Sequence, residues 1–138
     1  MGIEENKKVA LEYFHKFNSN DAKQMATILS DDLDWHFMGF SPLSKTVDKV
    51  TLLSAASSAF AAEKKTPITM TVKEMIAEGD RVAVEAESYM EPKEGPPVRN
   101  QYHYAFTIKD GRVKTGRVYF CTYSAAGGIA PPQNSGKS

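Results

Sequence analysis

Residues 100–122 read NQYHYAFTIKDGRVKTGRVYFCT, in which two alternating stretches flank the pair Asp110-Gly111. An Asp-Gly pair in this setting is among the strongest short-range signals of a β-hairpin. Because neighbouring residues of a strand point to opposite faces of a sheet, the two stretches predict strands over 100–109 and 112–122. One face of the first strand is then largely aromatic and carries Asn100, Tyr102, Tyr104 and Phe106.

Two more strands are expected before this hairpin. Residues 81–90 alternate between apolar and polar side chains and follow the turn Glu78-Gly79-Asp80. The strand before that turn begins near Thr66, and its inward residues are expected to be Ile68, Met70, Val72 and Ile76. Together with the hairpin, these strands predict a four-stranded antiparallel meander.

Two helices and a short strand are expected in the first 38 residues. The first helix spans 4–17, where Ala10, Tyr13, Phe14 and Phe17 recur at helical spacing and form one apolar face. Asp21 and Gln24 resemble a capping box that begins a second helix, with Met25, Ile28 and Leu29 directed inward. The aromatic run over 33–38 favours a strand.

A third helix is expected over residues 46–62, which are rich in alanine. Helical spacing assigns its inward face to Val47, Val50, Leu53, Ser57 and Phe60. This order of elements predicts an α+β fold, in which a cone-shaped curved antiparallel sheet is covered by the three N-terminal helices and leaves an internal cavity. One domain is expected over residues 1–123. Residues 124–138 are rich in Gly, Pro and Ser and are expected to form a flexible C-terminal tail.

Composition excludes several kinds of partner. The chain has 138 residues, with 17 Lys+Arg against 17 Asp+Glu, and this balance argues against a nucleic-acid footprint, which needs a basic excess. No apolar run approaches the ~20 residues of a membrane span, and the N-terminus lacks the apolar core of a signal peptide. Cys121 is the single cysteine and no zinc-type cluster is present. We therefore expect a cytoplasmic protein without metal or cofactor.

Four stretches carry a resemblance to a known family: Asn18-x-x-Asp21, Ser30-Asp31-Asp32-x-x-Trp35, residues 78–85, and residues 100–120 with their alternating aromatics. Over about residues 4–123 the chain resembles the nuclear-transport-factor-2-like superfamily, and within it the SnoaL-like branch that is related to ketosteroid isomerase. The resemblance implies a homodimer of cone-shaped domains, each with a small-molecule site. His103, on the opposite face to the aromatics, is then expected in a sheet-to-sheet dimer contact.

The resemblance also suggests catalytic residues. A gapless register places Tyr13 at the oxyanion-hole tyrosine of ketosteroid isomerase and Tyr104 near its protonated aspartate. Phe37 stands where that family has its aspartate base, which leaves the neighbouring His36 as the candidate base. SnoaL-type cyclases often show a Tyr-Phe-Asp-Thr motif, where this chain has Tyr119-Phe120-Cys121-Thr122. Both family aspartates are therefore missing.

Strand alternation places Trp35 and Phe37 on one face and His36 on the other, with the aromatic pair expected to be buried. The same alternation directs Glu85 and Glu87 outward, where Arg99, Arg112 and Arg117 are candidate partners within or between copies. The residues expected to line a substrate site are Phe17, Trp35, Phe37, Val84, Ala86, Asn100, Tyr102, Phe120 and Cys121, beside the candidate catalytic residues Tyr13, His36 and Tyr104.

Three functions are consistent with these residues. The first is binding of a largely apolar carbonyl-bearing metabolite, with isomerase, cyclase or hydratase activity on it. The second is a non-catalytic ligand-binding or dimerisation module of the same fold. The third is an interaction scaffold whose cavity is filled by its own aromatics. A cavity of ~300 Å³ or more would separate the first two from the third.

Overall fold

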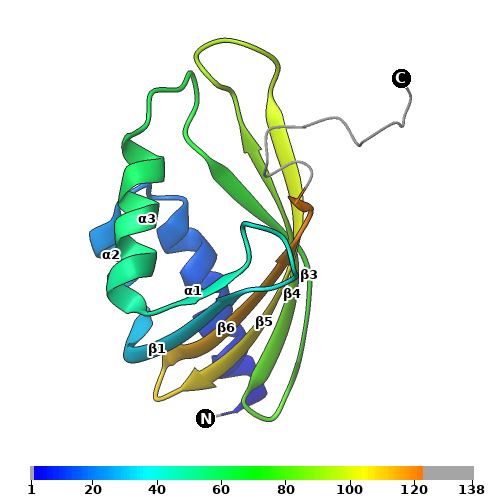
Figure 1. Cartoon of the computed structure of the whole chain (residues 1–138). Helices are drawn as coiled ribbons and strands as arrows, with labels where there is room; N and C mark the ends of the chain where they lie inside the picture. The colour runs from blue at the N-terminus through cyan, green and yellow to red at the C-terminus, as the bar shows by residue number, and fades with distance from the viewer. Residues whose placement is uncertain (1, 123–138) are drawn as a thin grey trace.

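The computed structural model describes residues 2–122, so the tail expected over 124–138 lies outside the described residues. Two helices, two strands and a third helix make up the first half, and four long strands follow (Figure 1). The elements are α1 (Ile3–Phe17), α2 (Ala22–Ala26), β1 (Leu29–Phe37), β2 (Lys45–Val47), α3 (Lys49–Ala61), β3 (Thr69–Glu78), β4 (Arg81–Met90), β5 (Val98–Lys109) and β6 (Arg112–Phe120).

The strands form one curved, open sheet in the order β2-β1-β6-β5-β4-β3. β3 to β6 make the expected antiparallel meander, and β1 joins it by pairing in parallel with β6. Figure 1 shows all three helices on one side of this sheet. The expected α+β fold is confirmed, with β1 as the strand that departs from an antiparallel arrangement. No helix within residues 2–122 is long and apolar enough to cross a membrane.

The core lies between α1 and the concave face of the sheet. Phe106 and Tyr104 of β5 are buried there, as the alternation of residues 100–106 predicts. From α1, Tyr13 and Phe14 meet them: the ring centroid of Phe14 lies 5.0 Å from that of Tyr104, edge to face. Burying rings of this size supplies much of the apolar area that stabilises a domain of this length.

The second helix is shorter than expected and ends at Ala26. Leu29 begins β1 and pairs with Val113 of β6, while the Val113 amide donates to the Ile28 carbonyl at 2.9 Å. Met25, Ile28 and Leu29 are nevertheless all buried, so their inward direction is confirmed. Met25 remains in α2, whereas pairing with β6 places Leu29 in a strand, because helix propensity over so short a segment is a weak preference.

The third helix begins later than expected, and its inward face is only partly the predicted one: Leu53 and Phe60 pack against the core, whereas Val50 and Ser57 are exposed. Residues 45–47 pair with β1 as β2, and Asp48 caps α3 by accepting from the Thr51 amide at 2.8 Å. Val50 is 76% exposed, while Leu52 is buried. Because Ala, Val and Leu occur all round this helix, spacing alone identified its inward face only in part.

A β-bulge changes the direction of side chains in β3. The register between β3 and β4 shifts between Val72 and Glu74, so residues after Lys73 face the other way. Ile76, expected inward, is 73% exposed, and Met75 and Ala77 pack against the core in its place. Met70 stays inward, and its backbone amide and carbonyl are both held by the Asn18 side chain, at 2.8 and 2.9 Å.

Candidate functional site

An apolar pocket of about 260 Å³ lies between the helices and the concave face of the sheet. Seven residues that the sequence singled out line it together: Tyr13, Phe17, Trp35, Phe37, Tyr102, Tyr104 and Phe120. Six lining residues were not predicted as part of a site: Met25, Leu52, Ala55, Ala56, Met70 and Val118. Most of these six come from α2, α3 and β3, where inward direction alone does not distinguish a pocket wall from the core.

The pocket contains three phenols. Tyr13 and Tyr104 are each only 3% exposed, yet neither hydroxyl makes a hydrogen bond to any residue in 2–122, and neither oxygen is sealed off from the pocket. The Tyr102 hydroxyl lies 3.2 Å from the Ser88 hydroxyl and shares a hydrogen bond with it. Two unpaired phenols therefore face an apolar space, where a polar group of a ligand could meet them.

Burial controls the ionisation of these phenols. It raises the pKa of the Tyr13 phenol well above its usual value near 10, and the nearby Tyr102 phenol raises it further. Burial also raises the pKa of Tyr104, with smaller contributions from Tyr13 and Tyr102. At neutral pH both groups are therefore uncharged and can donate a hydrogen bond.

The wall of the pocket beside the phenols is the indole of Trp35. Its ring centroid lies 5.5 Å from that of Tyr13 and 6.3 Å from that of Tyr104. Gly116 makes room for it on β6, since a Cβ at this position would come within 2.5 Å of Trp35 Cε3 and Cζ3. The sequence does not single out Gly116, because a glycine inside a strand does not reveal which side chain crosses it.

His36 does not reach the pocket. β1 alternates without a slip at this point, so His36 lies on the face opposite to Trp35 and Phe37. Its imidazole Nε2 lies 3.0 Å from Asp34 Oδ2, and its Nδ1 lies 2.9 Å from Thr46 Oγ1 on β2. The expectation that His36 could serve as a base in the pocket is therefore wrong.

Four further residues expected in the pocket lie elsewhere. Val84 and Ala86 are buried in β4 but are not among the residues that line the pocket. The Asn100 side chain ties β5 to the end of β6 instead, because its Nδ2 donates to the Cys121 carbonyl at 3.2 Å. Cys121 is exposed and lies outside the apolar pocket. Alternation predicted the face of Asn100 correctly but not that the pocket ends before it.

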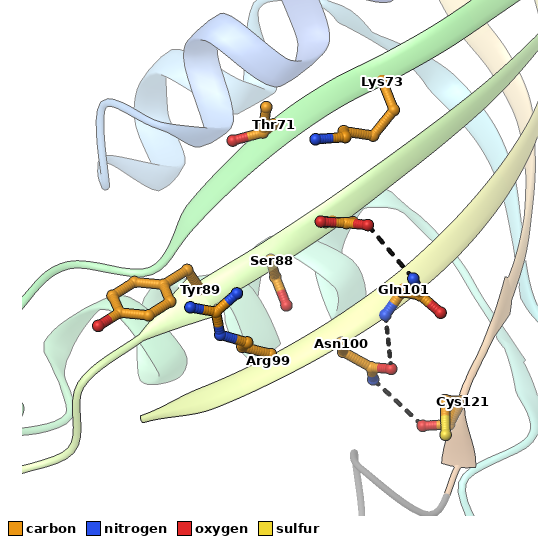
Figure 2. A pocket seen from close by; sticks show the side chains of 9 residues that line it. Thr71, Lys73, Ser88, Tyr89, Arg99, Asn100, Gln101 and Cys121 are labelled. Carbon is orange, nitrogen blue, oxygen red and sulfur yellow. Dashed lines mark hydrogen bonds between the residues drawn. The ribbon is translucent and has the colours of Figure 1, made fainter. Parts of the chain in front are cut away.

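Asn100 and Cys121 border a second hollow, of about 500 Å³, that opens on the outer face of the sheet (Figure 2). Its side chains are polar: Gln101 Nε2 donates to Glu87 Oε2 at 3.2 Å, and the guanidinium of Arg99 lies over the ring of Tyr89, 5.2 Å from its centroid. Figure 2 shows Lys73 and Arg99 extending over this hollow from β3 and β5.

The outer face carries charges that do not neutralise each other within the chain. Among residues 2–122, neither Lys73 nor any arginine forms an ion pair, and Glu85 has none either. Of the alternatives left open for Glu85 and Glu87, pairing with an arginine of the same copy does not occur among residues 2–122. No cluster of three or more His, Cys, Asp or Glu side chains that could hold a metal ion occurs in the described part of the chain.

Comparison with known proteins identifies relatives of this fold. The family model of the SnoaL-like domain matches residues 10–115, most of the chain. No curated protein matches the sequence.

Many solved structures are similar to this chain, and three of them illustrate the likeness. An epoxide hydrolase of the LEH-like kind from M. tuberculosis has a TM-score of 0.74 at 18% identity, covering 92% of this chain and 90% of its own. An NTF2-like protein from Burkholderia xenovorans LB400 has a TM-score of 0.72 at 21% identity, covering 94% and 99%. TerC, co-crystallised with polyporic acid, has a TM-score of 0.70 at 18% identity, covering 89% and 96%. At these identities the likeness concerns the fold.

Proposed function

The chain belongs to the SnoaL-like domain family, and from that premise we propose that it binds a small, uncharged, largely apolar molecule that carries a carbonyl or similar acceptor oxygen. The observation that carries the proposal is the pair of buried phenols, Tyr13 and Tyr104, that face the apolar pocket without a partner. A few polar groups in an otherwise apolar wall are typical of small-molecule sites. TerC, a protein of the same fold, was crystallised with polyporic acid.

The size of the pocket restricts the ligand. Its volume of about 260 Å³ is slightly below the lower limit that we set for a ligand site. It still exceeds the ~150 Å³ of an engineered apolar cavity that binds benzene. The pocket therefore suits a molecule of one or two rings. Its size favours ligand binding over the alternative in which the protein's own aromatic side chains fill the cavity.

The lining residues favour binding over turnover. None of the residues in 2–122 that line the pocket is a carboxylate, an imidazole or an amine. Isomerisation, cyclisation and hydration each need a group that takes up a proton near neutral pH, and a phenol of raised pKa holds its proton too tightly. The phenols can stabilise an oxygen that carries negative charge, but nothing beside them removes a proton. We therefore favour the non-catalytic ligand-binding module.

Blocking the pocket should abolish this binding. In Ala56→Phe, a ring on α3 enters the pocket, and we expect the affinity for the two-ring ketone 1-tetralone to fall at least ~30-fold, about 2 kcal/mol. Calorimetric titration of the folded variant measures it. Ala59→Phe, on the same helix but outside the pocket, is the matched control and should bind as the natural chain does. Equal affinity in the natural chain and Ala56→Phe would place the ligand elsewhere.

Removing the two hydroxyls should weaken the preference for a ketone. We expect Tyr13→Phe combined with Tyr104→Phe to weaken 1-tetralone binding about tenfold, because each lost hydrogen bond contributes roughly 0.5–1.5 kcal/mol. Tetralin has the same rings without the carbonyl and should bind both proteins about equally. Titration of the natural chain and of the double variant with each of the two compounds tests this. An unchanged ratio of ketone to hydrocarbon affinity would show that the phenols do not recognise the carbonyl.

We also propose that two copies pair through the outer faces of their sheets. That face carries both positive and negative side chains that form no ion pair with any residue in 2–122, and this supports the pairing. They are Lys73, Glu85, Arg99 and Arg117. In a two-fold pair, cations of one copy can meet carboxylates of the other. Sedimentation should show two copies for the natural chain and mostly single copies for Lys73→Glu combined with Arg99→Glu. Sedimentation of both proteins as single copies at about 100 µM would refute the pairing, since a specific dimer of this kind forms well below that concentration.

A further inference from the structure

Trp35 has a buried donor that the fold does not satisfy. The side chain is 2% exposed, and its Nε1 is the buried side-chain nitrogen or oxygen in residues 2–122 that lacks a hydrogen-bond partner. Nearly all buried polar groups in native proteins are hydrogen-bonded, and an exception calls for an explanation. Here the exception lies in a residue that forms the wall of the ligand pocket.

The packing of the indole fixes its orientation. The three atoms nearest to a Cβ built at Gly116 all belong to the six-membered ring of Trp35. Nε1, on the far side of the five-membered ring, therefore lies further from Gly116 than these atoms do. Tyr13 and Tyr104, whose rings contact the indole at centroid distances of 5.5 and 6.3 Å, supply the unpaired phenols of the same pocket. Three donors without partners thus belong to one aromatic cluster.

The indole differs from the phenols in what it can recognise. A phenol both donates and accepts, so it can meet a ligand hydroxyl, a ligand carbonyl or a water molecule. An indole N–H only donates, and only an acceptor atom satisfies it. We propose that the Trp35 N–H donates to the acceptor oxygen of the bound ligand and is the specificity-determining residue that selects carbonyl, ether or epoxide oxygens over plain hydrocarbons. This inference rests on the proposed function and names the group that the ligand must present.

Binding requires a small adjustment of the wall. Nε1 is shielded from solvent, so a water molecule does not reach it unless the surrounding side chains move. Met25 and Met70 are among the side chains that line the space, and unbranched methionine side chains change shape at little cost. A ligand oxygen that reaches Nε1 forms a hydrogen bond that no residue in 2–122 supplies. Roughly a tenfold preference for the acceptor-bearing ligand follows from satisfying one buried donor.

The single tryptophan makes this testable, because the ¹⁵N-labelled full chain gives one indole N–H cross-peak. On saturation with 1-tetralone we expect that proton to shift downfield, as hydrogen-bonded protons do, and tetralin to leave it without a comparable downfield shift. Trp35→Phe removes part of the wall for both compounds, but it should lower the affinity for 1-tetralone about tenfold more than the affinity for tetralin. The cross-peak test uses the natural chain, so it stands even where the variant does not fold.

Two outcomes separate this inference from the proposed function. An indole proton that moves equally with 1-tetralone and tetralin, while Ala56→Phe still abolishes binding, would overturn the role of Trp35 and leave the pocket as the binding site. Absence of saturable binding of either compound to the natural chain would overturn both.

Discussion

Replacing Gly116 with alanine is expected to destabilise the fold by about 1–3 kcal/mol, because overpacking a filled core forces side chains and backbone out of place. The new methyl group would lie 2.5 Å from two ring atoms of Trp35, well inside van der Waals contact. The indole is held on its other sides by Tyr13, Tyr104 and Phe106, so the ring cannot simply move away. Urea unfolding of the natural chain and the variant measures the loss.

A compensating change provides the control for this prediction. Trp35→Leu combined with Gly116→Ala should be more stable than the sum of the two single changes implies, because the smaller side chain leaves space for the methyl group. Strict additivity in this double-mutant cycle, or an unchanged free energy of unfolding in Gly116→Ala, would show that the indole does not rest on Gly116.

Alkaline pH should weaken the fold through its buried phenols. The folded pKa values of Tyr13 and Tyr104 are raised by burial, whereas in the unfolded chain each phenol ionises near its ordinary value of about 10. Above that pH the unfolded chain releases two protons that the folded chain retains, so the free energy of unfolding falls as the pH rises. The stabilisation is fully present below about pH 10 and is lost between there and the raised pKa values.

The size of this effect follows from linkage. Each phenol should cost about 1 kcal/mol between pH 10 and pH 11, or about 2 kcal/mol for the pair. Urea unfolding at a series of pH values from 9 to 11 measures it. Tyr13→Phe combined with Tyr104→Phe should flatten that dependence, with Tyr119→Phe, an exposed tyrosine, as the control that leaves it unchanged. The same steep decline in the double variant would show that other groups cause it.

The strand pattern was the reliable part of the sequence. Alternation over residues 100–106 placed Tyr104 and Phe106 inside, and the Asp110-Gly111 pair marked the β5–β6 turn, because both signals are local and need no knowledge of the rest of the chain. The bulge near Lys73 could not be predicted in this way: it inserts a residue into β3 and reverses every later side chain, including Ile76.

The candidate site was predictable where it is aromatic. Trp35, Phe37 and Tyr102 were assigned to the pocket by alternation within their own strands, and the structure brings them together. The wall supplied by α3 was missed, because Leu52 and Ala56 are distinguished from their neighbours only by how the helix is rotated against the sheet. Asn100 was assigned to the correct face but lies beyond the end of the pocket, where it holds Cys121.

A crystal structure of the protein in complex with 1-tetralone would test the central claim most directly. The account predicts the two rings in the pocket between α3 and β5, with the carbonyl oxygen within about 2.5–3.0 Å of the Tyr13 or Tyr104 hydroxyl. An empty pocket beside tetralone bound in the outer hollow, or rings in the pocket with the carbonyl turned away from every donor, would contradict it.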